Sequence, residues 1–210
     1  MPKTIRSLII ADGVHPSAAT IRSLWRETDV TVCADGGANF ARRIGIRPDI
    51  ILGDLDSITP QTIRKFRNVP LMFVDDQETT DLEKAILYCL SKKATSIAIT
   101  GGLGSRIDHA TGSLGCLKKY SSRCGITLYD SVGLIIPVNK SIRIRTKPRQ
   151  QISLIPLTRC TGVTTKNLKY PLTHESLELG VREGISNEAT SSIVTVWVRH
   201  GTLFLYKFRT

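Results

Sequence analysis

Two aspartates, Asp54 and Asp56, stand one residue apart after the apolar run 50–52, with Gly53 between the run and the first acid. Side chains two residues apart point the same way in an extended segment, so both carboxylates are expected to reach one cation. Hard divalent cations such as Mg²⁺ take carboxylate oxygens and usually bridge to substrate phosphates. The structural alternative is that Asp56 caps a helix beginning near Pro60. The pattern favours a metal–phosphate site.

Two further turns carry acids in a similar setting. The segment 34–39 holds an acid followed by two glycines, and the segment 76–81 ends in an acid at the start of a predicted helix. A carboxylate in the first turn of a helix also interacts favourably with the helix dipole, by ~0.3–1 kcal/mol, which is the structural alternative for Asp81. The candidate site residues in these two turns are Asp35, Gly36, Gly37, Asn39, Gln77, Thr80 and Asp81.

A glycine-rich turn at 101–109 leads into another predicted helix. Glycines such as Gly101 and Gly102 let backbone N–H groups approach phosphate oxygens, and Arg106 can clamp a phosphate with two hydrogen bonds. The turn lacks the spacing of a P-loop and of a dinucleotide fingerprint. Asp108 is a candidate for a substrate contact, and its structural alternative is an N-cap of the helix.

The first two thirds of the chain alternate between strands and helices. Nearly continuous apolar runs at 8–11, 30–34, 50–52, 71–74, 97–100 and 126–129 predict strands covered on both faces, as in a parallel sheet. Helical patterns lie between them, at about 17–27, 37–44, 60–67, 80–92 and 108–120. Ligands of such sheets bind beyond the carboxyl ends of the strands, which is where the candidate motifs fall.

The rest of the chain has a different pattern. Segments at 141–145, 151–157, 162–165, 192–198 and 202–208 alternate or run apolar, with Gly, Pro and Asn between them and no convincing helix. The fold class is therefore α/β, with a parallel-sheet N-terminal domain, 1–139, followed by a smaller all-β sandwich domain, 140–210.

Composition excludes several function classes. No stretch of 18 apolar residues is present, so no segment is expected to span a membrane. The five cysteines are odd in number and widely spaced, which favours buried free thiols in a cytoplasmic protein. The net charge of +11 is uneven, since 140–210 holds twelve Lys and Arg against four acids. That segment lacks a basic stripe interleaved with aromatic residues, so nucleic-acid binding is disfavoured.

Taken together, these motifs resemble those of the thiamine pyrophosphokinase family. The matching segments are 34–39, 48–57, 76–81, 101–109 and 184–188. Two departures are Leu55, where many members carry Phe, and the segment after Glu188, which lacks a glycine often found there. The order and spacing of the motifs extend over nearly the whole chain.

The resemblance implies transfer of an intact pyrophosphoryl group from ATP to the hydroxyl of thiamine, releasing AMP. It implies that Asp54, Asp56 and Asp81 hold Mg²⁺, and that Gln77, Thr80, Arg106 and Asp108 contact the nucleotide or help to orient the attacking hydroxyl. The other residues that it implies for ATP binding are Asp35, Gly36, Gly37, Asn39, Gly101 and Gly102. It also implies a homodimer with shared active sites, in which Ser186 and Asn187 lie at a thiamine pocket between two subunits. Asp54, Asp56, Asp81 and Asp108 are the catalytic candidates.

Two other functions stay open from the residues alone. The first is a pyrophosphokinase acting on a pterin alcohol with the same acids. The second is a binding module without enzymatic activity, in which the basic β domain grips nucleic acid and the acids cap turns.

Overall fold

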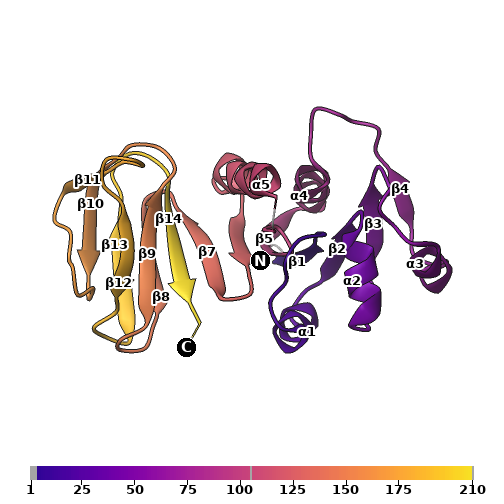
Figure 1. The fold of residues 1–210 in the computed structure, drawn as a ribbon, viewed down its shortest axis with the longest axis horizontal. Helices are drawn as coiled ribbons and strands as arrows, with labels where there is room; N and C mark the ends of the chain where they lie inside the picture. Colours follow the sequence, from indigo (N-terminus) through magenta and orange to yellow (C-terminus); the bar gives the residue numbers. More distant parts are fainter. Residues whose placement is uncertain (1–3, 105, 210) are drawn as a thin grey trace. The chain divides into compact units, whose positions relative to one another are not determined.

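The computed structural model describes residues 4–104 and 106–209, and the chain divides between Ser131 and Val132 into two compact units. We call Met1–Ser131 unit 1 and Val132–Thr210 unit 2 (Figure 1). The division falls earlier in the chain than the expected boundary at 139/140. The reason is β7 (Gly133–Val138), a strand that the sequence did not predict, which pairs along its whole length with β14 (Leu203–Phe208) of unit 2.

Unit 1 is a parallel sheet accompanied by helices, as the sequence predicted. Its strands lie in the order β6-β5-β1-β2-β3-β4, and every neighbouring pair is parallel. The strands are β1 Ile5–Ile10, β2 Val30–Ala34, β3 Ile50–Gly53, β4 Leu71–Phe73, β5 Ala94–Thr100 and β6 Gly125–Tyr129. The helices are α1 Ala18–Arg26, α2 Gly37–Arg43, α3 Pro60–Lys65, α4 Asp81–Ser91 and α5 Ile107–Tyr120.

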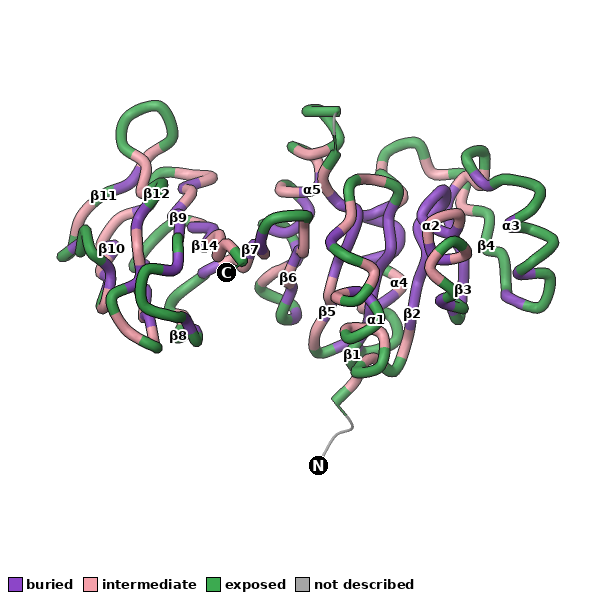
Figure 2. The backbone as a smooth tube through the Cα atoms, turned by 60° about the horizontal axis from the view of Figure 1, so that its bottom comes forward, coloured by how far each residue is buried: buried purple, intermediate pink, exposed green. Residues whose placement is uncertain are grey.

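The central strands of unit 1 are buried because helices cover them, and Figure 2 shows much of their backbone as buried. The prediction of a buried strand at 71–74 was wrong. Leu71, Met72 and Phe73 are exposed, since β4 is the edge strand and pairs only with β3. An apolar run does not distinguish a central strand from such an edge strand.

Hydroxyl side chains set where three of the helices begin. The side chains of Ser17, Thr59 and Thr80 accept hydrogen bonds from N–H groups in the first turns of α1, α3 and α4. Thr59 therefore caps the helix that Asp56 was the alternative candidate to cap. Asp108 is not an N-cap either, because α5 begins at Ile107.

Unit 2 is an all-β sandwich of two antiparallel sheets, ordered β12-β9-β14-β7 and β11-β10-β13-β8. Its remaining strands are β8 Ser141–Arg145, β9 Gln151–Pro156, β10 Cys160–Lys166, β11 Glu175–Leu177, β12 Gly184–Glu188 and β13 Ile193–Trp197. Both sheets contribute to one apolar core, which includes Leu154, Val196 and Leu205. The part of this unit that the structure describes contains no helix.

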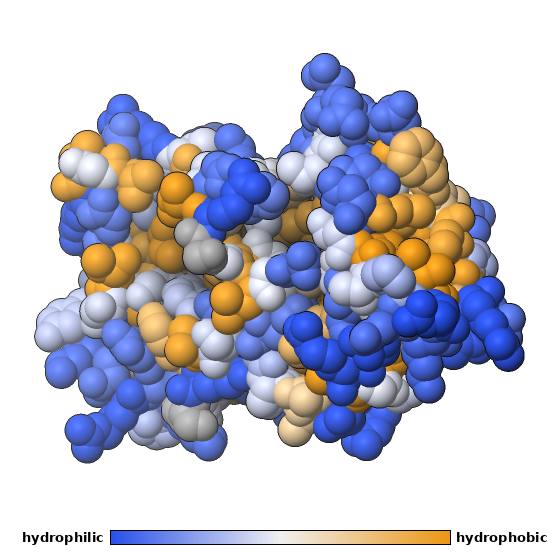
Figure 3. All heavy atoms as spheres, turned by 45° about the vertical axis from the view of Figure 1, so that its right-hand side comes forward, coloured by the Kyte–Doolittle hydropathy of each residue, from blue (hydrophilic) through white to orange (hydrophobic). Residues whose placement is uncertain are grey.

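The surface in the view of Figure 3 is largely hydrophilic, with apolar patches between the polar side chains. Among the described residues, no helix is long and apolar enough to cross a membrane. All five cysteines are buried and free, as the sequence predicted.

Candidate functional site

Three carboxylates from separate elements meet at the carboxyl edge of the parallel sheet. Asp35 follows β2, Asp54 follows β3, and Asp81 is the first residue of α4. One oxygen atom from each residue lies within 4.8 Å of the other two. Asp35 is buried, while Asp54 and Asp81 are half-buried. We call Asp35, Asp54 and Asp81 the acid group.

The acid group has the electrostatics of a cation site. Oδ1 of Asp35 is buried and has no hydrogen-bond partner among the described residues. Burial is the main cause that raises the pKa of Asp35, and hydrogen bonds from Ser57 and the Gly36 amide oppose it. The negative charges of Asp54 and Asp81 raise the pKa further, by smaller amounts. A buried oxygen without a partner, beside two more carboxylates, fits a hard divalent cation that takes oxygen ligands.

Gly53 allows the three acids to approach one another. Its φ is +142°, which a residue with a side chain rarely adopts. A Cβ atom at this position would lie 3.0 Å from Cβ of Asp35 and 3.0 Å from Oδ1 of Asp81. The glycine between the apolar run and Asp54 is therefore part of the geometry of the site.

Lys84 is a functional candidate that the sequence reasoning missed. Its Nζ lies 3.1 Å from Oδ1 of Asp81, and its side chain is 7% exposed. Lys84 and Asp81 are three residues apart on α4, so they share one face of the helix. That spacing is the signal that would have pointed to the lysine.

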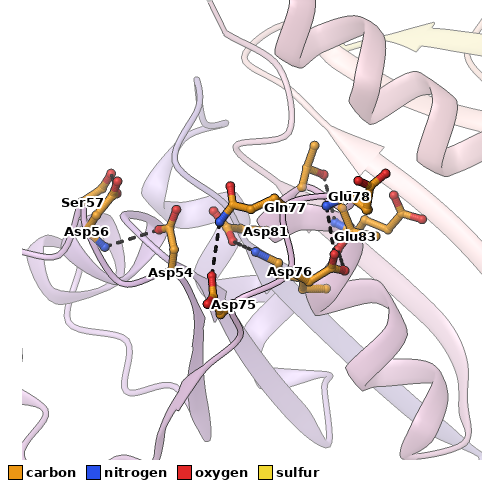
Figure 4. Close-up of polar contacts among 12 residues, drawn as sticks. Asp54, Asp56, Ser57, Asp75, Asp76, Gln77, Glu78, Asp81 and Glu83 are labelled. Carbon is orange, nitrogen blue, oxygen red and sulfur yellow. Dashed lines mark hydrogen bonds and ion pairs between the residues drawn. The ribbon is translucent and has the colours of Figure 1, made fainter.

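Asp56 lies outside the acid group, so the geometry expected for the pair 54 and 56 is not present. Leu55 has a φ of +62°, and the segment is not extended. The carboxylate of Asp56 accepts a hydrogen bond from the Ser57 hydroxyl at 2.8 Å, and its backbone N–H donates to Oδ1 of Asp54 at 3.4 Å. Figure 4 shows Asp56 and Ser57 on the side of Asp54 away from Asp81. The side-chain alternation of a strand fails here because Leu55 turns the chain.

The loop before α4 holds Gln77 and Thr80. Nε2 of Gln77 lies 3.5 Å from Oδ1 of Asp75. In the view of Figure 4, the Gln77 side chain lies next to Asp81. The Thr80 hydroxyl accepts from the N–H of Glu83, which is half of the expected capping box. The Glu83 carboxylate does not complete the box, because it accepts hydrogen bonds from Lys119 and Tyr120 of α5 instead.

The Asn39 side chain forms hydrogen bonds with the segment between Asp56 and α3. Its Oδ1 accepts hydrogen bonds from the Thr59 N–H at 3.0 Å and the Thr62 hydroxyl at 2.8 Å, and its Nδ2 donates to the Ser57 carbonyl at 2.8 Å. The sequence predicted Asn39 only as a nucleotide contact. In the structure its side chain ties α2 to the start of α3.

The predicted glycines lie where strand ends pack tightly. A Cβ atom at Gly37 would lie 2.1 Å from the Ile10 carbonyl oxygen, and one at Gly101 would lie 2.4 Å from the Ala11 carbonyl oxygen. Gly36 likewise faces the Asp12 carboxylate, and Gly102 faces Leu128. Gly37 and Gly101 need glycine because the neighbouring backbone leaves no room for a Cβ.

Arg106 and Asp108 pair with each other at the start of α5. Nη2 of Arg106 lies 2.5 Å from Oδ2 of Asp108, and both side chains are exposed. The hydrogen bond from Arg106 lowers the pKa of Asp108 to about 2. The structure thus brings these two predicted residues together, but not into the acid group.

Ser186 and Asn187 lie on β12 of unit 2, a strand that the sequence did not predict. Ser186 is exposed and its N–H donates to the Ser153 hydroxyl at 3.0 Å. Asn187 is buried, and its side-chain amide pairs with both the N–H and the carbonyl of Tyr170. Its amide has a structural role in this conformation.

Two protein-family models match the chain in sequence order. The model described as thiamin pyrophosphokinase, catalytic domain, matches residues 21–128, and the model described as thiamin pyrophosphokinase, vitamin B1 binding domain, matches residues 139–203. The chain belongs to the thiamine pyrophosphokinase family.

Relatives of known name agree with this placement. Thiamin pyrophosphokinase 1 of Caenorhabditis elegans is 31% identical over 198 residues, which cover 86% of this chain and 80% of the relative. Thiamine pyrophosphokinase of Bacillus subtilis is 29% identical over 212 residues, which cover 98% of both chains. The crystal structure of the thiamine pyrophosphokinase from Bacillus subtilis superposes with a TM-score of 0.83 at 27% identity, covering 96% of this chain and 98% of that one.

Membership of the thiamine pyrophosphokinase family confirms the resemblance and the two-part α/β and β-sandwich architecture. The comparisons give no support to a pterin pyrophosphokinase or to a nucleic-acid-binding module. Among the described residues, the acid group is the cluster of carboxylates that could hold a metal ion, and it lies within the segment that the catalytic-domain model matches.

Proposed function

We propose that this chain transfers the intact diphosphate group of ATP to the hydroxyl of thiamine, giving thiamine diphosphate and AMP. The observation that carries the proposal is that both family models match in order, and that the catalytic-domain match contains the acid group. Such transfer needs positioning and charge neutralisation more than a nucleophilic residue, so acids holding a metal, together with an arginine, suffice.

Asp35, Asp54 and Asp81 are the residues that would hold Mg²⁺. The bound ion would neutralise charge on the triphosphate. Lys84 fixes one oxygen of Asp81, so the other oxygen of this carboxylate can face a ligand. We keep Asp56 as a further candidate ligand, although its carboxylate lies outside the acid group in this structure.

The other candidate site residues of unit 1 would position the nucleotide. The candidates are Gly36, Gly37, Asn39, Gln77, Thr80, Gly101, Gly102, Arg106 and Asp108. Arg106 can turn from Asp108 to a phosphate, because their ion pair is exposed and exchanges readily with solvent. Released in this way, Asp108 is free to accept a hydrogen bond from the attacking hydroxyl, since its carboxylate is ionised at neutral pH.

On unit 2, Ser186 and Asn187 would contact thiamine. The exposed Ser186 hydroxyl is the more available group, since the Asn187 amide is occupied by Tyr170. We further propose a cytoplasmic homodimer with shared active sites. The five buried thiols fit a reducing compartment.

The direct test is incubation of the protein with ATP, Mg²⁺ and thiamine, followed by identification of both products. We expect AMP and thiamine diphosphate in equal amounts. Thiamine monophosphate, whose hydroxyl is blocked, is the matched negative control. Formation of ADP would indicate transfer of a single phosphate, and turnover with a pterin alcohol but not with thiamine would overturn the substrate assignment.

A further inference from the structure

A pocket lies on unit 2, and none of its lining residues belongs to the acid group. It has a volume of about 440 Å³ and lies on the sheet β11-β10-β13-β8. Its lining includes Lys140, Thr164, His174, Trp197 and Arg199. Sites for small molecules commonly have volumes of this size, about 300–1,000 Å³.

Backbone contacts hold this lining in place. Thr164 and Trp197 are cross-strand partners on β10 and β13, and the Val198 N–H donates to the Lys140 carbonyl at 2.8 Å. The His174 N–H donates to the Thr164 hydroxyl at 3.1 Å. The lining residues are therefore held by paired strands, so the shape of the pocket is fixed by the fold of unit 2.

The lining combines an aromatic face with positive charge. Trp197 is 40% exposed, so part of its ring is accessible to a ligand. Lys140 and Arg199 are also exposed, and neither forms an ion pair within the described part of the chain. The nearby acids Glu175 and Glu178 pair with arginines outside the lining, namely Arg182 and Arg159.

We propose that this pocket binds a nucleoside monophosphate, with its base stacked on Trp197 and its phosphate held by Lys140 and Arg199. Aromatic side chains stack on nucleobases of every kind, and lysine and arginine are the usual partners of phosphate. Thiamine fits less well, because its cationic thiazolium would meet two further cations. Free phosphate has no base to stack on Trp197, so it would use only the two cations. The proposal goes beyond the transfer reaction.

The test uses fluorescence, because Trp25 and Trp197 are the two tryptophans of the chain. In a Trp25→Phe protein, emission reports on Trp197 alone. We titrate this protein with AMP in the presence of EDTA, which prevents metal-dependent binding at the acid group. The expected result is saturable quenching that weakens as salt is added.

Variants of the lining identify the site. Arg199→Ala and Lys140→Ala, each in the Trp25→Phe background, are expected to weaken AMP binding about 10-fold, the loss of one hydrogen bond to a charged group. Lys166→Ala is the matched control, since Lys166 is an exposed cation on β10 outside the pocket lining. It is expected to bind AMP with unchanged affinity. Calorimetry with Trp197→Ala, which fluorescence cannot follow, should show a similar loss of about 10-fold.

Several results would overturn the proposal. These are no saturable quenching at millimolar AMP, equal affinity in Arg199→Ala and its control, and quenching by thiamine at least as strong as by AMP. Loss of quenching in Asp54→Asn would place AMP at the acid group instead. Diphosphate transfer is measured in the same proteins, so an inactive protein that still binds AMP refutes the proposed function alone.

Discussion

Nζ of Lys84 lies 3.1 Å from Oδ1 of Asp81, so one member of the acid group has a counter-ion built into its own helix. The other two members, Asp35 and Asp54, form no ion pair within the described part of the chain. Two carboxylates without a counter-ion match the charge of one divalent cation. The lysine therefore sets how much negative charge the acid group presents to a metal.

Replacing Lys84 by Met tests this relationship. The change leaves three carboxylates facing one another without a cation, and we expect it to destabilise the metal-free protein by about 1–3 kcal/mol. Mg²⁺ should then raise Tm more in the variant than in the wild type, because the ion relieves more repulsion. Lys118→Met, which removes an exposed lysine of α5, is the control. An equal Mg²⁺-dependent rise of Tm in both variants would contradict the account.

Asp54→Asn is expected to lower kcat/KM of diphosphate transfer by at least ~10²-fold, since loss of one electrostatic contact to the transition state has about that effect. Thermal unfolding in EDTA should show a fold at least as stable as the wild type, because the change removes one of the charges that repel one another in the acid group. Glu27→Gln removes an exposed acid at the end of α1 and should keep full activity. Retained activity in Asp54→Asn would remove Asp54 from the metal site.

The position of the Asp56 side chain could not be predicted from the sequence. The motif predicted two ligands from side-chain alternation, and the left-handed backbone of Leu55 breaks that alternation. A positive φ at a leucine has no sequence signal, because such a conformation is unusual for this residue type. The loss of activity in Asp56→Asn, relative to that in Asp54→Asn, measures whether the Asp56 carboxylate contributes to transfer.

Other features followed from the sequence alone. Apolar runs ending in acids predicted the parallel sheet and the edge at which Asp35 and Asp81 meet. The sandwich followed from the alternation after residue 139. The edge position of β4 and the burial of Lys84 did not follow, since both depend on which elements become neighbours in the fold.

Gly53→Ala is expected to damage both the fold and the activity. The added Cβ would lie 3.0 Å from Asp35 Cβ and from Asp81 Oδ1, and a φ of +142° is strained for alanine, at a cost of about 1–3 kcal/mol. Gly115→Ala is the matched control. Apart from the backbone of the helix itself, no atom of the described residues lies within 4 Å of the Cβ that it would add to α5, so a gain of about 0.5–1 kcal/mol is expected. Urea unfolding of both variants gives the comparison. A Gly53→Ala protein that keeps its stability and its transfer rate would refute the role of Gly53.

His15 should make the stability of the protein depend on pH. Its ring stacks on Phe40 with centroids 3.6 Å apart, and its Nδ1 is buried without a hydrogen-bond partner among the described residues. Burial, with the charge of Arg43, lowers the pKa of His15 from 6.5 to about 4. Between those values the unfolded chain binds the proton and the folded protein does not, so stability falls as pH decreases through this window.

The size of this effect follows from the two pKa values. His15 should cost about 2 kcal/mol of stability between pH 7 and pH 5. His15→Gln removes the titrating group, and we expect urea unfolding of this variant to depend less on pH over that range by the same amount. His200→Gln, at an exposed histidine of unit 2, should keep the wild-type dependence. If His15→Gln and the wild type lose equal stability between pH 7 and pH 5, His15 does not stay neutral in the folded protein.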